Sequence, residues 1–358
     1  MIVHGGFHGS LADTDLEPPQ AQSTMWLWRS ETNTWHEVLQ AIGDSVSGTL
    51  ARIDHSLTAY ADGGLVMHGG RDLGVGEATT WIGSLNAVTD VDGVTYSCTW
   101  SPAPHQGAPR YGHAAFHDEE AGRVVLVGGV AEAEAGFAVA LDVDGTGGWL
   151  PLGDLGKAQP PARTHAAVAM AADAVVVVGG HAVSVDGAAP EVMSDAWRYD
   201  GGANAWSSFE VPDGVPGLAG AFFTYHDGAW ILGGGDSAMP VSWRRSWSLD
   251  VTELTWLSTG PWPGLPPRTG ATVVVRPDTG ETWLVGGSRM PGGFPLMDAH
   301  AWTPGSTQWQ PLADALSPVP NTLDTTRPGL TGASGVWDPV AQAVLLAGGR
   351  DVATGQLS

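Results

Sequence analysis

Arg110-Tyr-Gly-His113, Val124-Val-Leu-Val127 and Gly128-Gly129 follow one another in one stretch of the chain, and this stretch decides the fold. The apolar run is β-branched apart from one Leu and is too short for a helix, which predicts a buried β-strand. The glycine pair permits positive φ angles and a close approach of other backbone. A short apolar run that ends in Gly-Gly occurs seven times, at intervals of 51 to 64 residues. The pairs are Gly5-Gly6, Gly69-Gly70, Gly128-Gly129, Gly179-Gly180, Gly233-Gly234, Gly286-Gly287 and Gly348-Gly349.

Tryptophan recurs in phase with the glycine pairs. After most pairs comes a loop and then two Trp-bearing segments, as with Trp197 and Trp206 on either side of Asp200-Gly-Gly202. Turn residues between two such segments are typical of a β-hairpin. Eleven of the 17 tryptophans hold these places, and we expect them to pack between repeat units. They are Trp26, Trp35, Trp81, Trp100, Trp149, Trp197, Trp206, Trp247, Trp256, Trp302 and Trp309.

A further strand precedes each later Gly-Gly strand, and we call its first residues the opener. The openers are Arg52-Ile-Asp-His55, Arg110-Tyr-Gly-His113, Arg163-Thr-His165, Leu218-Ala-Gly220, Arg268-Thr-Gly270 and Gly329-Leu-Thr-Gly332. We expect His55, His113 and His165 to occupy the same place in their units. An opener strand, a Gly-Gly strand and a Trp hairpin make four short antiparallel strands in about 50 residues, which describes a propeller blade.

The succession of Arg-x-Gly-His, an apolar run, Gly-Gly, an aromatic residue and Trp resembles the kelch repeat, and it covers essentially the whole chain. The resemblance implies an all-β, kelch-type β-propeller whose four-stranded antiparallel blades surround a channel, each with its first strand innermost. We expect one propeller over residues 1–358, cut within a blade at both ends, with six or seven blades and incomplete terminal units. A ring of six blades closes if residues 329–349 supply the two inner strands of one blade and residues 26–38 its two outer strands. Residues 2–6 then have no place in a blade. An architecture of seven units is slightly favoured over six.

Composition limits the partners and the cellular location. The chain has 15 basic and 38 acidic residues, a net charge of -23, which disfavours nucleic acid and anionic membrane surfaces as partners. Its single cysteine, Cys98, excludes an intrachain disulfide, and the sequence predicts neither a membrane span nor a signal peptide. Scarce Lys with abundant Ala and Gly suggests GC-rich bacterial coding, and an exported or cell-surface location fits that interpretation.

The openers and two loops supply the candidate ligand-binding residues. The opener Arg and His side chains are expected at one mouth of the channel, where propeller loops gather, or else they serve the fold. Tryptophan and arginine in Pro- and Arg-rich loops are suited to stacking on a sugar or on a partner's side chain. The candidates are Arg52, His55, Arg110, His113, Arg163, His165, Trp243, Arg244, Trp262 and Arg268.

Two Asp-x-Asp-Gly stretches supply candidate metal ligands. Alternate carboxylates suit Ca²⁺, although neither stretch continues as an EF-hand, and Asp-Gly is also a hairpin turn signal. The candidates are Asp90, Asp92, Asp142 and Asp144. Ca²⁺ at these turns is the one cofactor that the sequence suggests.

Known kelch-like enzymes provide no matching active site. Cys98 lies in an outer hairpin, which disfavours the copper-radical site of galactose oxidase, and Tyr199 stands where the iron-binding pattern of nitrile-specifier proteins has His. The sequence therefore favours a non-catalytic scaffold that presents blade loops to a protein or glycan. Long connections at 9–24, 71–80, 182–194 and 236–245 support this hypothesis. The alternative is a carbohydrate-active enzyme or lectin with its site at the channel mouth.

Overall fold

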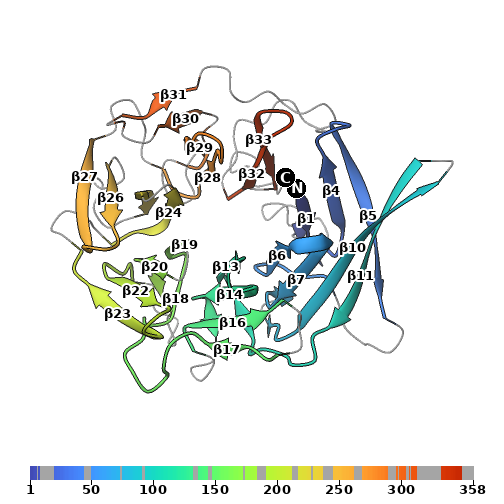
Figure 1. Ribbon diagram of the computed structural model, residues 1–358, viewed down its shortest axis with the longest axis horizontal. Coiled ribbons are helices and arrows are strands. Elements are labelled where there is room, and N and C mark those ends of the chain that lie inside the picture. The colour runs from blue at the N-terminus through green and yellow to red at the C-terminus, as the bar shows by residue number, and fades with distance from the viewer. Residues whose placement is uncertain are drawn as a thin grey trace, which may run out of the picture.

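The computed structural model shows an all-β protein whose strands form seven groups around a ring, with the first strand of each four-stranded group innermost (Figure 1). We number these groups as units I to VII in chain order. The structure describes residues 1–5, 7–8, 20–43, 50–72, 75–90, 93–131, 136–143, 147–171, 174–183, 191–211, 217–226, 229–236, 245–261, 268–288, 296, 298–303, 306, 308–312 and 332–348.

Units II to VI each have four antiparallel strands, in order from the centre to the rim. Unit II contains β6 (Ser56–Tyr60), β7 (Gly64–His68), β10 (Thr80–Asp90) and β11 (Gly93–Pro102), with a short 3₁₀ turn, η1 (Ala61–Gly63). Unit III contains β13 (Ala114–Asp118), β14 (Arg123–Val127), β16 (Ala138–Asp142) and β17 (Leu150–Pro151). Unit IV contains β19 (Ala167–Ala171), β20 (Ala174–Val178), β22 (Ala196–Asp200) and β23 (Ala205–Phe209).

Unit V contains β24 (Ala219–His226), β25 (Ala229–Asp236), β26 (Arg245–Asp250) and β27 (Thr255–Pro261). Unit VI contains β28 (Thr272–Val275), β29 (Thr282–Val285), β30 (Ala299–Trp302) and β31 (Gln310–Pro311). Among the described strands, unit I has β1 (Ile2–His4), β4 (Met25–Arg29) and β5 (Thr34–Ile42), and unit VII has β32 (Ser334–Asp338) and β33 (Ala343–Ala347).

Units I and II share one continuous sheet. The hairpin of β10 and β11 is the long one that the spacing of Trp81 and Trp100 predicts. Its outer strand β11 pairs in parallel with β5, from Tyr96 beside Val38 to Trp100 beside Ile42. The result is a seven-stranded sheet in the order β1-β4-β5-β11-β10-β7-β6.

Unit VII lies between units VI and I and completes the ring. Thr272 donates a 2.7 Å hydrogen bond to the Ala333 carbonyl, and the indole of Trp28 donates to Asp338 at 3.3 Å. Because β1 pairs with β4, residues 2–4 are not surplus, and the described strands form seven units rather than six. That the chain is a single propeller cut within a blade at both ends stays a prediction.

Tryptophans of the outer strands connect neighbouring units, as predicted. Trp100 donates to Gln40 of unit I, Trp149 to Thr80 of unit II and Trp206 to the Leu152 carbonyl beside unit III, at 2.8–2.9 Å. The buried residues of adjacent units form shared hydrophobic clusters around these indoles. Trp26 is an exception, since 40% of its surface is exposed.

Candidate ligand-binding face at the mouth of the ring

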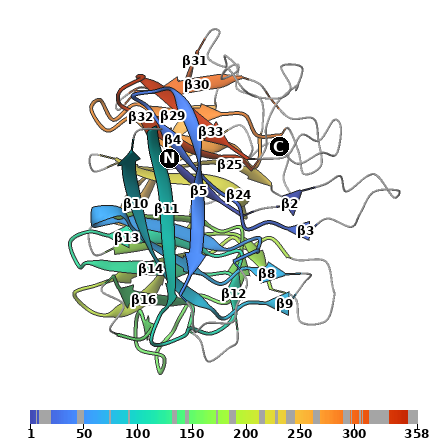
Figure 2. The ribbon, with the colours of Figure 1, turned by 90° about the vertical axis from the view of Figure 1, so that its right-hand side faces the viewer.

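The long connections gather on one face of the ring, which we call the loop face. Because the strands of a unit alternate in direction, the links from second to third strand and from each unit to the next lie at the same face. Four small two-stranded sheets lie there: β2 (Phe7–His8) with β3 (Gln20–Ala21), β8 (Arg71–Asp72) with β9 (Val75–Gly76), β12 (Arg110–Tyr111) with β15 (Val130–Ala131), and β18 (Arg163–Thr164) with β21 (His181–Ala182). Figure 2 shows several of them on one side. The connections 9–24, 182–194 and 236–245 that the sequence singles out lie largely outside the described residues.

The opener arginines hold the turns of their own units. Arg52, Arg110, Arg163 and Arg268 are at most 2% exposed. Each donates from Nη1 to a carbonyl of the glycine pair that follows it, as Arg163 does to Gly179 at 3.0 Å. These contacts give the four guanidinium groups a structural role, and ligand binding by them stays a prediction.

In units II to V the second glycine of the pair donates its N–H to a carbonyl of the next unit. The Gly70 N–H donates to the Arg110 carbonyl and the Gly180 N–H to the Leu218 carbonyl, at 2.8 and 2.7 Å. A Cβ on Gly179 would lie 2.2 Å from the Leu218 oxygen, which explains why this position is glycine. In unit V the pair with this geometry is Gly234-Gly235, so the expected assignment to Gly233-Gly234 was wrong by one residue.

Two of the buried arginines have carboxylate partners. Arg163 makes a bidentate ion pair with Asp195 at 2.6 and 2.7 Å, and Arg268 makes the same pair with Asp298 at 2.7 Å. Partial burial alone would raise the pKa of Asp195, but hydrogen bonds from Arg163 and Trp197 outweigh it and lower that pKa. Both carboxylates are 34% exposed, and each offsets the charge of the buried arginine with which it pairs.

His55 and His113 join neighbouring units. His4 Nδ1 lies 3.2 Å from His55 Nε2, and His113 Nε2 lies 2.9 Å from the Ser56 hydroxyl. Burial lowers the pKa of His4 to about 4 and that of His55 to about 3, and it holds the pKa of His113 well below its ordinary value. These imidazoles are therefore neutral near pH 7 and act as hydrogen-bonding groups between units.

His165 does not share the position of His55 and His113, and the expected register was wrong. It is the second residue after its arginine rather than the third, and it corresponds to the glycine of Arg-x-Gly-His. The residues at this position all have φ between 54° and 71°: Asp54, Gly112, His165, Gly220, Gly270 and Gly332. Their backbones connect adjacent units, as when the Gly112 N–H donates to the Asp54 carbonyl and the Gly220 N–H to that of His165. Asp54 and His165 are the only members of this inner ring that carry a side chain, and both are exposed.

Five residues at the inner ring form what we call the mouth cluster: Asp54, Arg71, Tyr111, His165 and His181. Arg71 Nε lies 2.6 Å from Asp54 Oδ2, and its guanidinium carbon lies 5.3 Å from the Tyr111 ring centroid. The ring centroids of His165 and His181 are 6.0 Å apart. Partial burial and His181 lower the pKa of His165, while the charge of Asp54 acts in the opposite direction. The two halves of the cluster therefore influence each other electrostatically.

Sequence reasoning identified only His165 of this cluster. Arg71 and His181 directly follow a glycine pair, and each pairs with the second residue of the opener in its unit, Ile53 or Thr164. Polar residues at these two places, together with a non-glycine residue at the third opener position, were the available signal.

The remaining candidates lie elsewhere. Trp243, Arg244, Trp262, Asp92 and Asp144 are outside the described residues, as is the side chain of Asp90. Asp142 is exposed at the end of β16, on the face opposite the loop face. The part of the chain that the structure describes contains no group of three or more side chains arranged to hold a metal, and Ca²⁺ binding stays a prediction.

Seven β units tied by opener arginines, glycine-pair turns and inter-unit tryptophans define a kelch-type β-propeller. The chain matches the KLHDC2/KLHL20/DRC7 Kelch-repeats domain over residues 87–287 and belongs to this family. It is similar to the solved structure of YjhT, with a TM-score of 0.52, 20% identity, and coverage of 69% of this chain and 74% of that one. This likeness concerns the fold alone. The comparison with curated proteins found no match.

Among the described residues, no helix is long and apolar enough to cross a membrane.

Proposed function

We propose that the protein is a non-catalytic binding scaffold that holds a protein partner against its loop face, with the mouth cluster as the central contact. The observation that carries the proposal is the Asp54–Arg71–Tyr111 group at the inner ring, in which Asp54 is exposed and Arg71 and Tyr111 are partly exposed. An arginine ordered by a carboxylate and an aromatic ring is typical of residues that dominate binding energy in protein interfaces. Its position among the long connections allows one partner to contact several units at once.

Charge indicates what kind of partner fits. The chain has 38 acidic and 15 basic residues, a net charge of -23. A negatively charged protein attracts a positively charged partner, which accelerates their association, and it repels acidic partners. We therefore propose a partner with a basic segment, whose binding weakens as salt concentration rises.

The proposal can be tested with substitutions in the mouth cluster, and a similar group of residues on the face opposite the loop face provides a matched control. Arg29 pairs with Glu31 at 3.1 Å and lies 6.0 Å from the Tyr96 ring, so it repeats the arginine–carboxylate–tyrosine group away from the mouth. The test variant carries Asp54→Asn and Arg71→Ala, because Asn tolerates positive φ. The control carries Arg29→Ala and Glu31→Gln.

Selection from a displayed library of random peptides, followed by titration of the enriched peptides, tests the proposal. We expect basic peptides that bind the parent and the control alike and bind the mouth variant at least tenfold more weakly. A glycan array run in parallel distinguishes the alternative. Glycans that depend on the mouth cluster, with no peptide that does, would replace this proposal with the lectin or carbohydrate-active alternative.

A further inference from the structure

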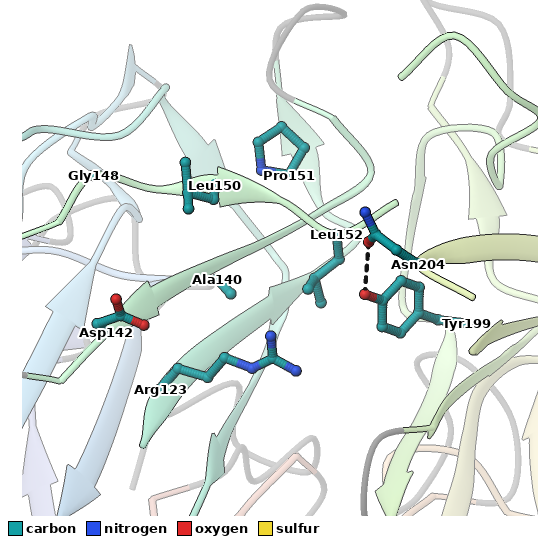
Figure 3. A pocket seen from close by; sticks show the side chains of 9 residues that line it. All are labelled: Arg123, Ala140, Asp142, Gly148, Leu150, Pro151, Leu152, Tyr199 and Asn204. Atoms are coloured by element: carbon teal, nitrogen blue, oxygen red, sulfur yellow. Dashed lines mark hydrogen bonds between the residues drawn. The ribbon is translucent and has the colours of Figure 1, made fainter. Parts of the chain in front are cut away.

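A polar cavity lies between units III and IV, near the face opposite the mouth cluster (Figure 3). Its volume is about 160 Å³, whereas one water molecule needs about 10–15 Å³. Arg123 of β14 and Asp142 of β16 come from unit III, and Tyr199 of β22 and Asn204 of the following turn come from unit IV. The cavity is therefore large enough for a compact organic molecule and has charged groups of both signs.

Arg123 on β14 lies directly opposite two carboxylates, Asp118 on β13 and Asp142 on β16, and opposite charges in such positions ordinarily pair. It pairs with the first of them. Its Nε donates to Asp118 Oδ2 at 2.9 Å, while the other oxygen of that carboxylate accepts the Ala121 N–H. Asp118 is only 6% exposed, so this pair fixes one edge of the guanidinium. The end of the Arg123 side chain extends toward Tyr199 (Figure 3).

The unit IV wall is equally well fixed. Asn204 Oδ1 accepts hydrogen bonds from the Tyr199 hydroxyl at 2.9 Å and from the Gly153 N–H at 3.1 Å. Because the oxygen is engaged twice, the amide Nδ2 is the Asn204 atom left to donate to a ligand. Asn204 has a φ of 46°, a conformation that Asn tolerates better than most residues.

We propose that this cavity binds a small zwitterion of the α-amino acid class. The ligand carboxylate would be held by the outer nitrogens of Arg123, whose planar fork suits two carboxylate oxygens. Its ammonium group would be held by Asp142, which is exposed and has no ion-pair partner among the described residues. Ala140, Leu150 and Leu152 form the apolar part of the wall and favour a short aliphatic side chain.

Titration calorimetry with alanine, acetate and ethylamine tests the charge requirement. We expect alanine to bind with a Kd of about 1 mM or tighter, and each singly charged analogue at least tenfold more weakly. Asp142→Asn should bring the affinity for alanine down to that for acetate. Arg123→Lys keeps a positive charge beside Asp118 but removes the fork, and it should weaken both ligands at least tenfold.

Glu119→Gln is the matched control, since it removes one exposed carboxylate from the turn between β13 and β14 without lining the cavity. It should bind alanine like the parent. The proposal is overturned if alanine does not bind at about 10 mM, if acetate binds as tightly as alanine, or if Asp142→Asn binds like the parent. Because Asp142 is exposed, that last comparison decides the matter even if Arg123→Lys fails to fold.

Discussion

The glycine pair of unit IV allows the contact between units to be measured. We consider Gly179→Ala, with Gly122→Ala as its control. Both glycines have nearly the same positive φ, 60° and 63°, so the backbone strain of an alanine is about 1–2 kcal/mol at either site. Around Gly122 a new Cβ meets nothing within 4 Å, whereas at Gly179 it would lie 2.2 Å from the Leu218 oxygen.

The clash forces units IV and V apart locally. Displacement of the Leu218 carbonyl disrupts its 2.7 Å bond from the Gly180 N–H and disturbs the Arg163 bond to the Gly179 carbonyl. Leaving a buried hydrogen-bonding group unsatisfied costs about 1–3 kcal/mol. We therefore expect Gly179→Ala to lower the free energy of unfolding by about 2–5 kcal/mol, and Gly122→Ala by only about 1–2 kcal/mol.

Equilibrium unfolding in urea, followed by tryptophan fluorescence and by circular dichroism, measures both losses. Agreement between the two probes establishes that a single free energy describes the transition. Equal losses for the two variants would refute the reasoning, because only strain, and not the contact between units, would then act at Gly179.

Three further predictions concern the buried polar groups. The pKa values of His4, His55 and His68 lie at about 4, 3 and 3, below the ordinary value of 6.5. Below about pH 6.5 the unfolded chain therefore binds more protons than the folded protein. The free energy of unfolding should be highest above that pH and should fall at lower pH by up to about 1.4 kcal/mol per pH unit for each histidine. Urea midpoints from pH 7.5 to 5 measure this loss, and a flat profile would contradict it. Trp206→Phe should cost about 1–3 kcal/mol, because it leaves the Leu152 carbonyl without its donor, whereas Trp26→Phe at an exposed site should cost less than about 1 kcal/mol; thermal unfolding compares them. Asp195→Asn should lower the free energy of unfolding by about 3 kcal/mol, because it leaves Arg163 buried without its countercharge. Urea unfolding measures this loss, and Asp200→Asn, which removes the carboxylate of the partly exposed Arg198–Asp200 pair, is the control.

The fold was predictable because its signals repeat. Glycine pairs and apolar runs recur in every unit and paired tryptophans in most, so an error in one copy, such as the one-residue shift at Gly233, does not change the result. The parallel pairing of β5 with β11 was not predictable, because it depends on how far one long hairpin reaches in space.

The candidate site was harder to predict because the repeated polar residues serve the fold. Arg52, Arg110, Arg163 and Arg268 recur because each of them holds the glycine-pair turn of its own unit, and their burial removes them from the surface. Residues that act on a ligand belong to individual units, and they appear as departures from the repeat. Asp54 and His165 are such departures, since every other described member of the inner ring is glycine.

This reasoning leads to a last prediction about Asp54 and His165. A side chain at positive φ costs about 1–2 kcal/mol and persists where something else requires it. Replacing both with glycine restores the repeat, relieves that strain and removes one exposed ion pair worth at most about 1 kcal/mol. Glycine also gives the unfolded chain more conformational freedom, and this reduces the gain in stability from the relieved strain by about 0.5–1 kcal/mol per site. The double variant should therefore unfold within about 2 kcal/mol of the parent in urea, yet bind mouth-selected peptides at least tenfold more weakly. If it loses stability heavily while binding is retained in the folded fraction, the two side chains serve the inner ring itself, and the mouth cluster is not the contact that we propose.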